Sequence, residues 1–443
     1  MLTKPVLTKP VLTKPVLALP AGPVIVNNQF RMHPTKLIHK KSLPPQTFPP
    51  LTLAQNDHLP RAIELVIAYD YLISPDQLES AFNHGVEAFP HVTGQIQSLE
   101  AGKPWHILPS SRGLPLEIFE MQKNITIRIL EQLPVRTHRS YFMPGTDEDA
   151  PQDHLLAARL TQTTDGLSIL GLKASHAALD GTGLGLFLYH CTARIHGKSP
   201  PAVIHQRPDT HINPTAEIPE LPHGYTLAEN PADISDDLAA RPSTIFTINI
   251  KEACHQLGAS SYLDARLRLS ACLCHSLANI HPGFSEIAVW CDPRGLPGFP
   301  ATFTGNSGCY LHIPLQNLSA TDLTKRICGL ASRQGFRKTA ETQQRIQQAQ
   351  NAGHHVAWKG PADDILQLNL VPHAAESANF GHGPPVFGLM LSRNSSGLRI
   401  AITPDGRRFL IEAALPDPLG PTLPQLCRDA HLTPEIWCQG TLP

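Results

Sequence analysis

Apolar residues in the first half of the chain alternate between continuous runs and helical spacing. Residues 62–72 and 167–174 are nearly continuous apolar runs with the length of a buried strand. The tripeptide Ser-Pro-Asp at 74–76 is typical of a helix start. A further helix is predicted from Asp180 to Gly197, because apolar residues recur there at helical spacing: Leu184, Phe187, Leu188, Cys191 and Ile195.

The second half repeats this mixture of strands and helices. Residues 261–280 predict a strongly apolar helix, and residues 287–290 predict a short buried strand. Residues 387–391 and 398–403 predict two paired strands around the turn signal Asn-Ser-Ser-Gly at 394–397. The pattern therefore favours an α/β (or α+β) fold made of two similar sandwich domains.

The length of the chain also favours two domains, because 443 residues are too many for one ordinary core. Residues 200–242 are rich in proline and predict a crossover linker between halves at 26–199 and 243–443. Residues 1–25 form a low-complexity leader in which Leu-Thr-Lys-Pro-Val occurs three times. Its regularly spaced prolines forbid a helix, so we expect a disordered leader, with an organelle address or a basic docking tail as alternatives.

Composition narrows the range of partners. The chain has 36 Lys and Arg residues against 37 Asp and Glu residues, so its net charge is close to zero. A strong positive electrostatic field that would attract nucleic acid or an anionic membrane is therefore not expected. No apolar stretch approaches the roughly 20 residues that span a bilayer. Nine cysteines, an odd number, favour buried thiols in a reducing compartment over a disulfide framework. We therefore expect a cytoplasmic monomer without a membrane span.

His176 is the strongest candidate for catalysis, since it lies between the predicted strand 167–174 and the helix that begins at Asp180. Strand ends on rigid scaffolds are where reactive groups are usually held. An imidazole, with an ordinary pKa of about 6.5, can take a proton at neutral pH, and such a base typically contributes roughly 100- to 10,000-fold. Asp180 could orient the ring or brace the loop. Gly181 and Gly183 add little bulk, so a substrate could approach closely.

Two other groups of residues are weaker candidates. Cys272, Cys274 and His275 lie in one apolar helix, where adjacent positions point to different faces, so core packing is the better interpretation than a metal site. His354 and His355 follow a glutamine-rich polar stretch and predict an exposed loop. No glycine motif of the nucleotide-binding type has the required context. We expect neither a metal nor a bound cofactor.

Four stretches resemble, in order and approximate spacing, motifs of the BAHD acyltransferases and the related condensation domains of peptide synthetases. Residues 176–181, His-Ala-Ala-Leu-Asp-Gly, resemble the HxxxDG motif. Asp-Pro-Arg at 292–294 with Phe-Thr-Gly-Asn at 303–306 resembles the D-x-R and Y-F-G-N segments. Residues 379–384 resemble D-F-G-W-G, and residues 91–96 resemble P-L-A-G-R-L.

The resemblance implies two domains with a channel between them, acyl-CoA as co-substrate, and a small alcohol or amine as acceptor. His176 would deprotonate the acceptor, which attacks the thioester carbonyl without an acyl-enzyme. Asp180 and Gly181 would support the site, with Asp180 paired to Arg294 instead of touching substrate. Asn369 matches a position where the family often has Ser, Thr or Asn, and is the candidate oxyanion donor.

The last motif departs from the family pattern. Asn379, Gly381 and Gly383 belong to this CoA-side motif, in which Asn379 replaces the family's Asp and His382 its Trp. An Asn keeps hydrogen bonds but loses the charge, so we expect a local ion pair to be missing. His382 is a candidate second base or a surface histidine. The single histidine after Ser175 differs from condensation domains and favours a free acyl-CoA donor.

The sequence thus favours an O- or N-acyltransferase of secondary metabolism or detoxification. Two alternatives stay open. One is a stand-alone condensation or ester-forming enzyme that uses carrier-bound or long-chain acyl donors. The other is a non-catalytic descendant that binds a ligand or partner between the halves, and the altered residue Asn379 is its support.

Overall fold

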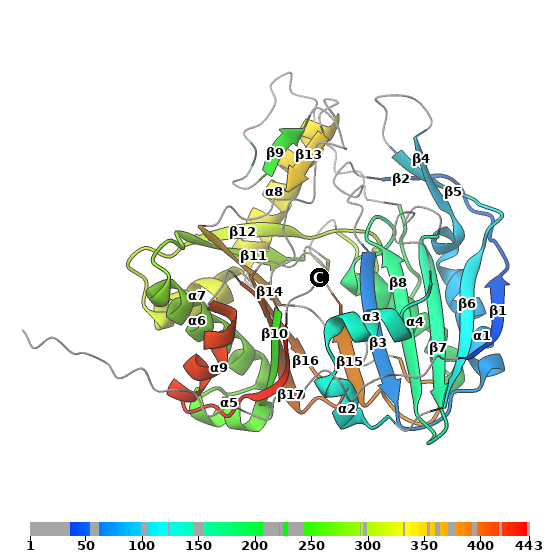
Figure 1. Cartoon of the computed structure of the whole chain (residues 1–443). Coiled ribbons are helices and arrows are strands. Elements are labelled where there is room, and N and C mark those ends of the chain that lie inside the picture. Colours follow the sequence, from blue (N-terminus) through cyan, green and yellow to red (C-terminus); the bar gives the residue numbers. More distant parts are fainter. Residues whose placement is uncertain are drawn as a thin grey trace, which may run out of the picture. The chain divides into compact units, whose positions relative to one another are not determined.

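Two large mixed sheets form the framework of the structure, which is a computed structural model (Figure 1). The residues that it describes are 36–53, 62–98, 105–122, 125–145, 154–206, 221, 225–228, 243–292, 294–295, 299–330, 333–351, 355–358, 364–370, 378–391, 397–415 and 419–440. They all belong to one compact unit, residues 35–443. The leader at 1–25 lies outside the described residues.

The first sheet has the strand order β1-β6-β7-β8-β3-β15. The strands are β1 (Lys36–Leu43), β6 (Leu114–Met121), β7 (Leu156–Thr163), β8 (Ser168–Ser175), β3 (Ala62–Tyr69) and β15 (Phe387–Met390). The central strands β3, β7 and β8 are buried over almost their whole length. The apolar runs of β3 and β8 predict this, because both faces of a strand in a covered sheet are buried.

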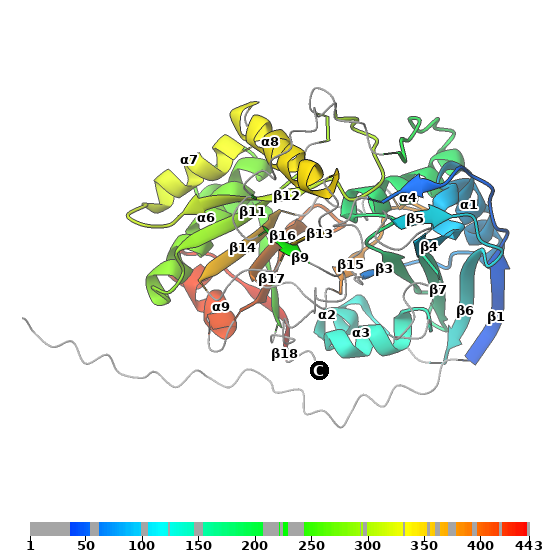
Figure 2. The same cartoon turned by 90° about the horizontal axis from the view of Figure 1, so that it is seen from above.

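Helices cover both faces of this sheet (Figure 2). They are α1 (Pro75–Ala88), α2 (Ile127–Gln132), α3 (Val135–Phe142) and α4 (Gly181–Ala193), with short 3-10 turns η2 (Pro90–Thr93) and η3 (Arg194–His196). α1 and α4 pack side by side on one face, where Phe82 and Phe187 are fully buried, and α2 and α3 lie on the other. A Cβ at Gly171 of β8 would lie 1.8 Å from the carbonyl oxygen of Phe142, so glycine there lets the end of α3 approach the sheet.

The second sheet has the strand order β12-β11-β14-β16-β17-β10-β18. The strands are β12 (Cys309–Pro314), β11 (Glu286–Cys291), β14 (Ile365–Leu370), β16 (Gly397–Ile402), β17 (Arg408–Ala414), β10 (Ser243–Asn249) and β18 (Glu435–Gly440). The helices of this part are α5 (Ile250–Gln256), α6 (Tyr262–Ile280), α7 (Ala320–Leu330), α8 (Arg333–Asn351) and α9 (Leu419–Asp429). α5, α6, α7 and α9 contribute to one apolar core with one face of the sheet.

The two faces of the second sheet differ in chemistry because side chains alternate along each strand. Leu366 and Leu368 of β14 join the apolar core under the helices. Gln367 and Asn369 therefore lie on the opposite face, where Arg399 of β16 is the register partner of Asn369. Gln367 and Arg399 are buried and Asn369 is half-buried, so this face holds a row of polar side chains.

Most of the predicted elements are present with small differences in their bounds. The run 62–72 forms β3 and the run 167–174 forms β8, while Ser74 and Ser261 each precede a helix. Ile195 is an exception, since α4 ends at Ala193 and the chain tightens into η3, which leaves Ile195 36% exposed. The predicted end of the helical segment at Gly197 is confirmed, because Gly197 follows η3 with a φ angle of 62°, and Ile195 is the residue that departs from the predicted apolar face.

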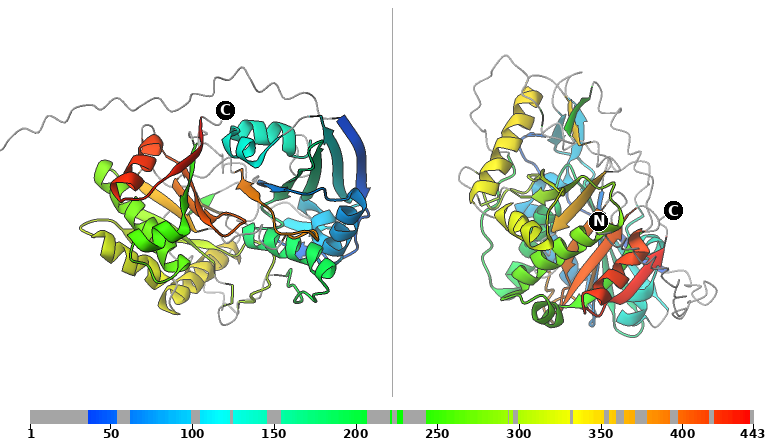
Figure 3. Two further views of the ribbon diagram at one scale, coloured as in Figure 1. Left: turned by 90° about the horizontal axis from the view of Figure 1, so that it is seen from below. Right: turned by 90° about the vertical axis from the view of Figure 1, so that its left-hand side faces the viewer.

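The prediction of a hairpin formed by 387–391 and 398–403 was wrong. β15 pairs with β3 in the first sheet, whereas β16 pairs with β14 and β17 in the second (Figure 3). Local turn chemistry cannot distinguish a hairpin from a chain that passes between two sheets, because both need a bend between two apolar runs. The expected turn at 394–397 lies mostly outside the described residues.

Two small sheets complete the described structure. They are β2 (Leu51–Thr52), β5 (Trp105–Leu108) and β4 (Gln95–Ser98) in one, and β13 (His355–Trp358) with β9 (Tyr225–Ala228) in the other. β9 and Ile204 lie within the range 200–242 predicted as a linker, and both pair with later parts of the chain, β9 with β13 and Ile204 with Phe303. The division into domains at this range stays a prediction.

None of the described helices has the length and apolarity needed to cross a membrane.

Candidate functional site

His176 occupies the first position of a turn that begins where β8 ends at Ser175. The carbonyl of Ser175 accepts hydrogen bonds from the backbone N–H groups of Ala178 (3.0 Å) and Leu179 (3.1 Å). Ala177, Ala178 and Leu179 are buried, whereas His176 is half-buried. The apolar residues thus anchor the turn in the core, and the histidine is held at its edge.

Asp180 closes this turn and begins helix α4. Its Oδ1 accepts a hydrogen bond from the N–H of Gly183 at 2.8 Å, which satisfies one of the free N–H groups of the first helical turn. Burial raises the pKa of Asp180, against the opposing effects of the Arg294 charge and the Gly183 N–H. The turn between β8 and α4 is therefore fixed at both ends, by Ser175 and by Asp180.

Arg294 connects Asp180 to a distant segment of the chain. Its Nη2 lies 2.8 Å from Asp180 Oδ1, and its Nη1 lies 2.6 Å from Asp292 Oδ2. The same guanidinium donates to the carbonyls of Phe303 (2.7 Å) and Gly305 (2.6 Å). The pairing of Asp180 with Arg294 that the resemblance implied is present, and Arg294 also holds the loop that contains the Phe-Thr-Gly-Asn segment.

Asp292, which the sequence places in the D-x-R segment without a role of its own, is a second centre of this network, and its partners Thr182 and Ser307 were missed. Its Oδ2 accepts from the hydroxyl of Thr182 at 3.2 Å, and its Oδ1 accepts from the hydroxyl of Ser307 at 2.8 Å. The backbone N–H of Ser307 also lies 3.4 Å from Asp180 Oδ2. A hydroxyl beside a motif carries no signal of its own in a sequence, because Ser and Thr are common at helix starts and in loops.

The two glycines after Asp180 have different surroundings. A Cβ at Gly181 would meet no atom within 4 Å, so this position has open space around it. A Cβ at Gly183 would lie 2.1 Å from the carbonyl oxygen of Thr304. The expectation that Gly183 makes room for substrate was therefore wrong, because the space beside it is filled by the chain itself.

Two histidines, His91 and His205, lie near the turn that contains His176 or its neighbouring segments, and neither was assigned a role from the sequence. His91 is 1% exposed, and its Nε2 lies 3.3 Å from the carbonyl oxygen of Ala178. Its ring is 4.6 Å from that of His205, whose Nε2 lies 2.8 Å from the Ala88 carbonyl and whose Nδ1 lies 3.0 Å from the Thr304 hydroxyl. His91 thus contacts the turn that contains His176, and His205 connects the end of α1 to the loop that contains Thr304.

Burial favours the neutral form of both histidines. Burial lowers the pKa of His91 to about 3, with a smaller contribution from His205 in the same direction. Burial also lowers the pKa of His205. A neutral His91 beside a carbonyl oxygen must donate from Nε2, since a carbonyl only accepts.

Asn369, the candidate oxyanion donor, lies on β14 next to the strand that leads to Asp292. Val289 of β11 is the register partner of Leu368, so the residues that follow them, Trp290 and Asn369, lie side by side. Asp292 comes two residues after Trp290, which is about 7 Å along an extended chain. The Oδ1 of Asn369 accepts a hydrogen bond from the hydroxyl of Tyr310 at 3.1 Å.

The segment around Asn379 packs against the first sheet and its helices. Asn379 Oδ1 accepts from the N–H groups of Gly381 (2.9 Å) and Gly383 (3.1 Å), so the expected hydrogen bonds are kept without the charge. Gly381 and Gly383 have φ angles of 114° and 136°, a region that favours glycine. Tyr71 of the loop after β3 donates to the Gly383 carbonyl at 3.0 Å, and its ring lies edge-on to exposed His382.

The residues considered for a metal site lie elsewhere. Cys274 is fully buried in α6 and Cys272 is half-buried, and burial raises the pKa of both thiols. His354 lies outside the described residues, and His355 begins β13. Among the described residues, no group of three or more His, Cys, Asp or Glu side chains is placed to hold a metal ion.

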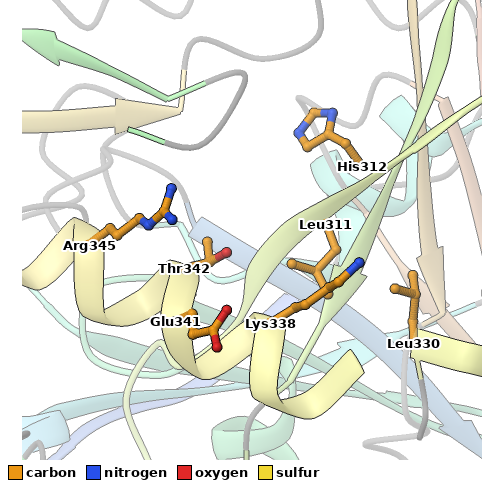
Figure 4. Close-up of a pocket in the computed structure, with 7 residues that line it drawn as sticks. All are labelled: Leu311, His312, Leu330, Lys338, Glu341, Thr342 and Arg345. Atoms are coloured by element: carbon orange, nitrogen blue, oxygen red, sulfur yellow. The ribbon is translucent and has the colours of Figure 1, made fainter. Parts of the chain in front are cut away.

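A pocket of about 190 Å³ lies between α8 and β12, apart from the residues of the predicted site (Figure 4). Its lining residues are Leu311, His312, Leu330, Lys338, Glu341, Thr342 and Arg345. Lys338, Glu341 and Arg345 are exposed, and Glu341 is paired with exposed Arg337 at 3.1 Å. This pocket contains neither His176 nor any residue that contacts Asp180 or Arg294.

Comparison with known proteins identifies the fold. No family model matches the chain, and no curated protein matches it. Among solved structures, it is similar to vinorine synthase (TM-score 0.63, 13% identity, 91% of this chain and 100% of that one). F. graminearum TRI101 in complex with coenzyme A and deoxynivalenol is also similar (TM-score 0.66, 13% identity, 87% and 100%), as is the first condensation domain of the CDA synthetase (TM-score 0.54, 14% identity, 89% and 98%). The fold is thus that of the BAHD acyltransferases and condensation domains.

Proposed function

We propose that this protein is an acyltransferase that moves an acyl group from acyl-CoA to the hydroxyl or amine of a small molecule. The observation that carries the proposal is the position of His176, at the edge of a turn fixed by the pairing of Asp180 with Arg294. The fold supports it, because F. graminearum TRI101 has a similar fold and its structure contains coenzyme A together with deoxynivalenol.

In the proposed reaction, His176 takes the proton of the acceptor hydroxyl or amine as that atom attacks the thioester carbonyl. The carbonyl oxygen becomes an oxyanion, for which Asn369 is the proposed donor. As the carbonyl re-forms, the C–S bond breaks, and the CoA thiolate receives the proton from His176. Asp180, Gly181 and Arg294 hold the turn, and the segment with Asn379, Gly381 and Gly383 is proposed to lie on the CoA side.

The test is a mass-spectrometric screen of acyl-CoA donors against pooled alcohols and amines. The proposal predicts an ester or amide product together with free CoA. Carrier-bound acyl groups, offered in parallel, separate this function from that of a condensation enzyme. Binding of CoA or an acceptor without turnover across a broad panel would contradict the proposal and favour a non-catalytic protein.

We further propose that the protein is a cytoplasmic monomer that acts in secondary metabolism or detoxification.

A further inference from the structure

Tyr310 reaches across a neighbouring strand to contact Asn369. Tyr310 lies on β12 and Asn369 on β14, and β11 runs between them in the sheet. The Tyr310 hydroxyl is nevertheless 3.1 Å from Asn369 Oδ1, and both side chains are half-buried. The tyrosine therefore lies along the polar face of the second sheet, not perpendicular to it.

The position of Tyr310 is set by aromatic and backbone contacts. Its register partner on β11 is Trp290, and the two rings meet edge to face with centroids 5.0 Å apart. Trp290 itself packs on Gly308, where a Cβ would lie 2.1 Å from the indole ring. The backbone N–H of Tyr310 donates to the hydroxyl of Tyr225 at 3.1 Å. These contacts direct the phenol toward β14 and restrict its movement.

The contact selects one orientation of the Asn369 amide. An amide can rotate so that its Oδ1 and Nδ2 exchange places, and only Nδ2 can donate to an oxyanion. A phenol is a better donor than acceptor because its lone pair is delocalised into the ring, so Tyr310 favours Oδ1 at its side. Nδ2 then points away from Tyr310, and donation to Oδ1 polarises the amide and strengthens its N–H donors.

We propose that Tyr310 is a positioning residue that fixes the Asn369 amide as an oxyanion donor, an inference that rests on the acyltransferase function proposed above. Without Tyr310, Asn369 would spend part of its time with Oδ1 toward the oxyanion, where two partial negative charges repel. The effect belongs to the transition state and not to binding of acyl-CoA, because the charge on the oxygen develops only during the reaction.

The experiment compares Tyr310→Phe in the wild type, in Asn369→Ala and in Asn369→Ser. Phenylalanine keeps the ring contact with Trp290 and removes only the hydroxyl. In the wild type we expect kcat to fall roughly fivefold to tenfold with little change in KM for acyl-CoA, as for the loss of one orienting hydrogen bond. In either Asn369 background we expect Tyr310→Phe to have no further effect, because alanine has no donor and a serine hydroxyl needs no amide orientation.

Thermal unfolding is measured for each variant together with its kinetics, to show that the variant is folded. Equal losses of kcat from Tyr310→Phe in all three backgrounds would overturn the inference, since the hydroxyl would then act independently of Asn369. Unchanged kcat in folded Tyr310→Phe would overturn it too, while leaving the proposed function intact. Absence of acyl transfer by the wild-type protein with every donor would overturn both.

Discussion

Two glycines that are separated by a single residue in the sequence, Gly181 and Gly183, differ in the side chains that they tolerate. Gly183 lies against the carbonyl of Thr304, whereas a Cβ at Gly181 would meet no atom within 4 Å. We expect Gly183→Ala to lower the free energy of unfolding by about 1–3 kcal/mol, because the new Cβ meets backbone and cannot be accommodated by a rotamer change. Thermal unfolding measures this directly.

Gly181→Ala is the matched control, because it makes the same chemical change in the same helical turn. Its stability should be unchanged or higher by about 0.4–1 kcal/mol, since alanine lowers the entropy of the unfolded chain. A raised KM for either substrate in folded Gly181→Ala would locate that substrate beside the turn. Equal destabilisation by the two alanines would contradict the surroundings described for Gly183.

The sequence predicted some of these contacts and not others. The pairing of Asp180 with Arg294 was predicted because both residues lie in stretches that resemble known motifs. The contacts of Thr182 and Ser307 were not predicted, since they depend on a carboxylate that lies more than a hundred residues from one and fifteen from the other. Side-chain contacts of that kind are set by tertiary packing, which local patterns do not encode.

At the scale of elements, Arg294 links the turn between β8 and α4 to the loop that follows β11. Both Asp180 and Arg294 are nearly inaccessible to solvent, with side chains 8% and 5% exposed. Arg294→Ala would leave the buried carboxylate of Asp180 without its cation, so we expect a loss of about 3–5 kcal/mol in the free energy of unfolding. Activity should fall together with stability.

Arg337→Ala provides the comparison for that measurement. Arg337 is also paired with a carboxylate, Glu341, but its side chain is 83% exposed, so its removal should cost less than about 1 kcal/mol. Denaturant unfolding of both variants gives the two values under identical conditions. A folded Arg294→Ala with the stability of the wild type and only slow turnover would show that Arg294 acts in the chemistry and not as a brace.

Elements built from local signals were predictable, and the connections between them were less so. β3, β8 and α6 follow from apolar runs and helix-start residues. The pairing of β15 with β3 joins residues more than three hundred positions apart, and no local pattern distinguishes it from the expected hairpin with β16. Long-range strand pairing depends on which edge is free when the chain collapses.

At the scale of the whole molecule, buried histidines make stability depend on pH. Burial lowers the pKa of His91 to about 3 and that of His138 to about 4. In the unfolded chain a histidine titrates at about 6.5, so below that pH the unfolded state binds more protons than the folded state. The free energy of unfolding should therefore have its full value above about pH 6.5 and should fall as the pH is lowered toward 4.

Urea unfolding between pH 7.5 and 4.5 tests this dependence, with His138→Gln as the variant. Glutamine can still donate to the Leu130 carbonyl that His138 contacts, at 3.0 Å, but it does not titrate. Its unfolding free energy should decline less steeply with acid than that of the wild type. Parallel curves for the two proteins would contradict the assignment of His138 as a neutral buried group.

The most direct test of the central claim is thioester consumption by His176→Ala with an acyl-CoA and acceptor that the wild type uses. The account predicts a rate at least roughly 100-fold lower in a variant that folds normally, because the acceptor then lacks its base. His255→Ala, at an exposed position on α5, should leave the rate unchanged. Undiminished turnover in folded His176→Ala would contradict the account.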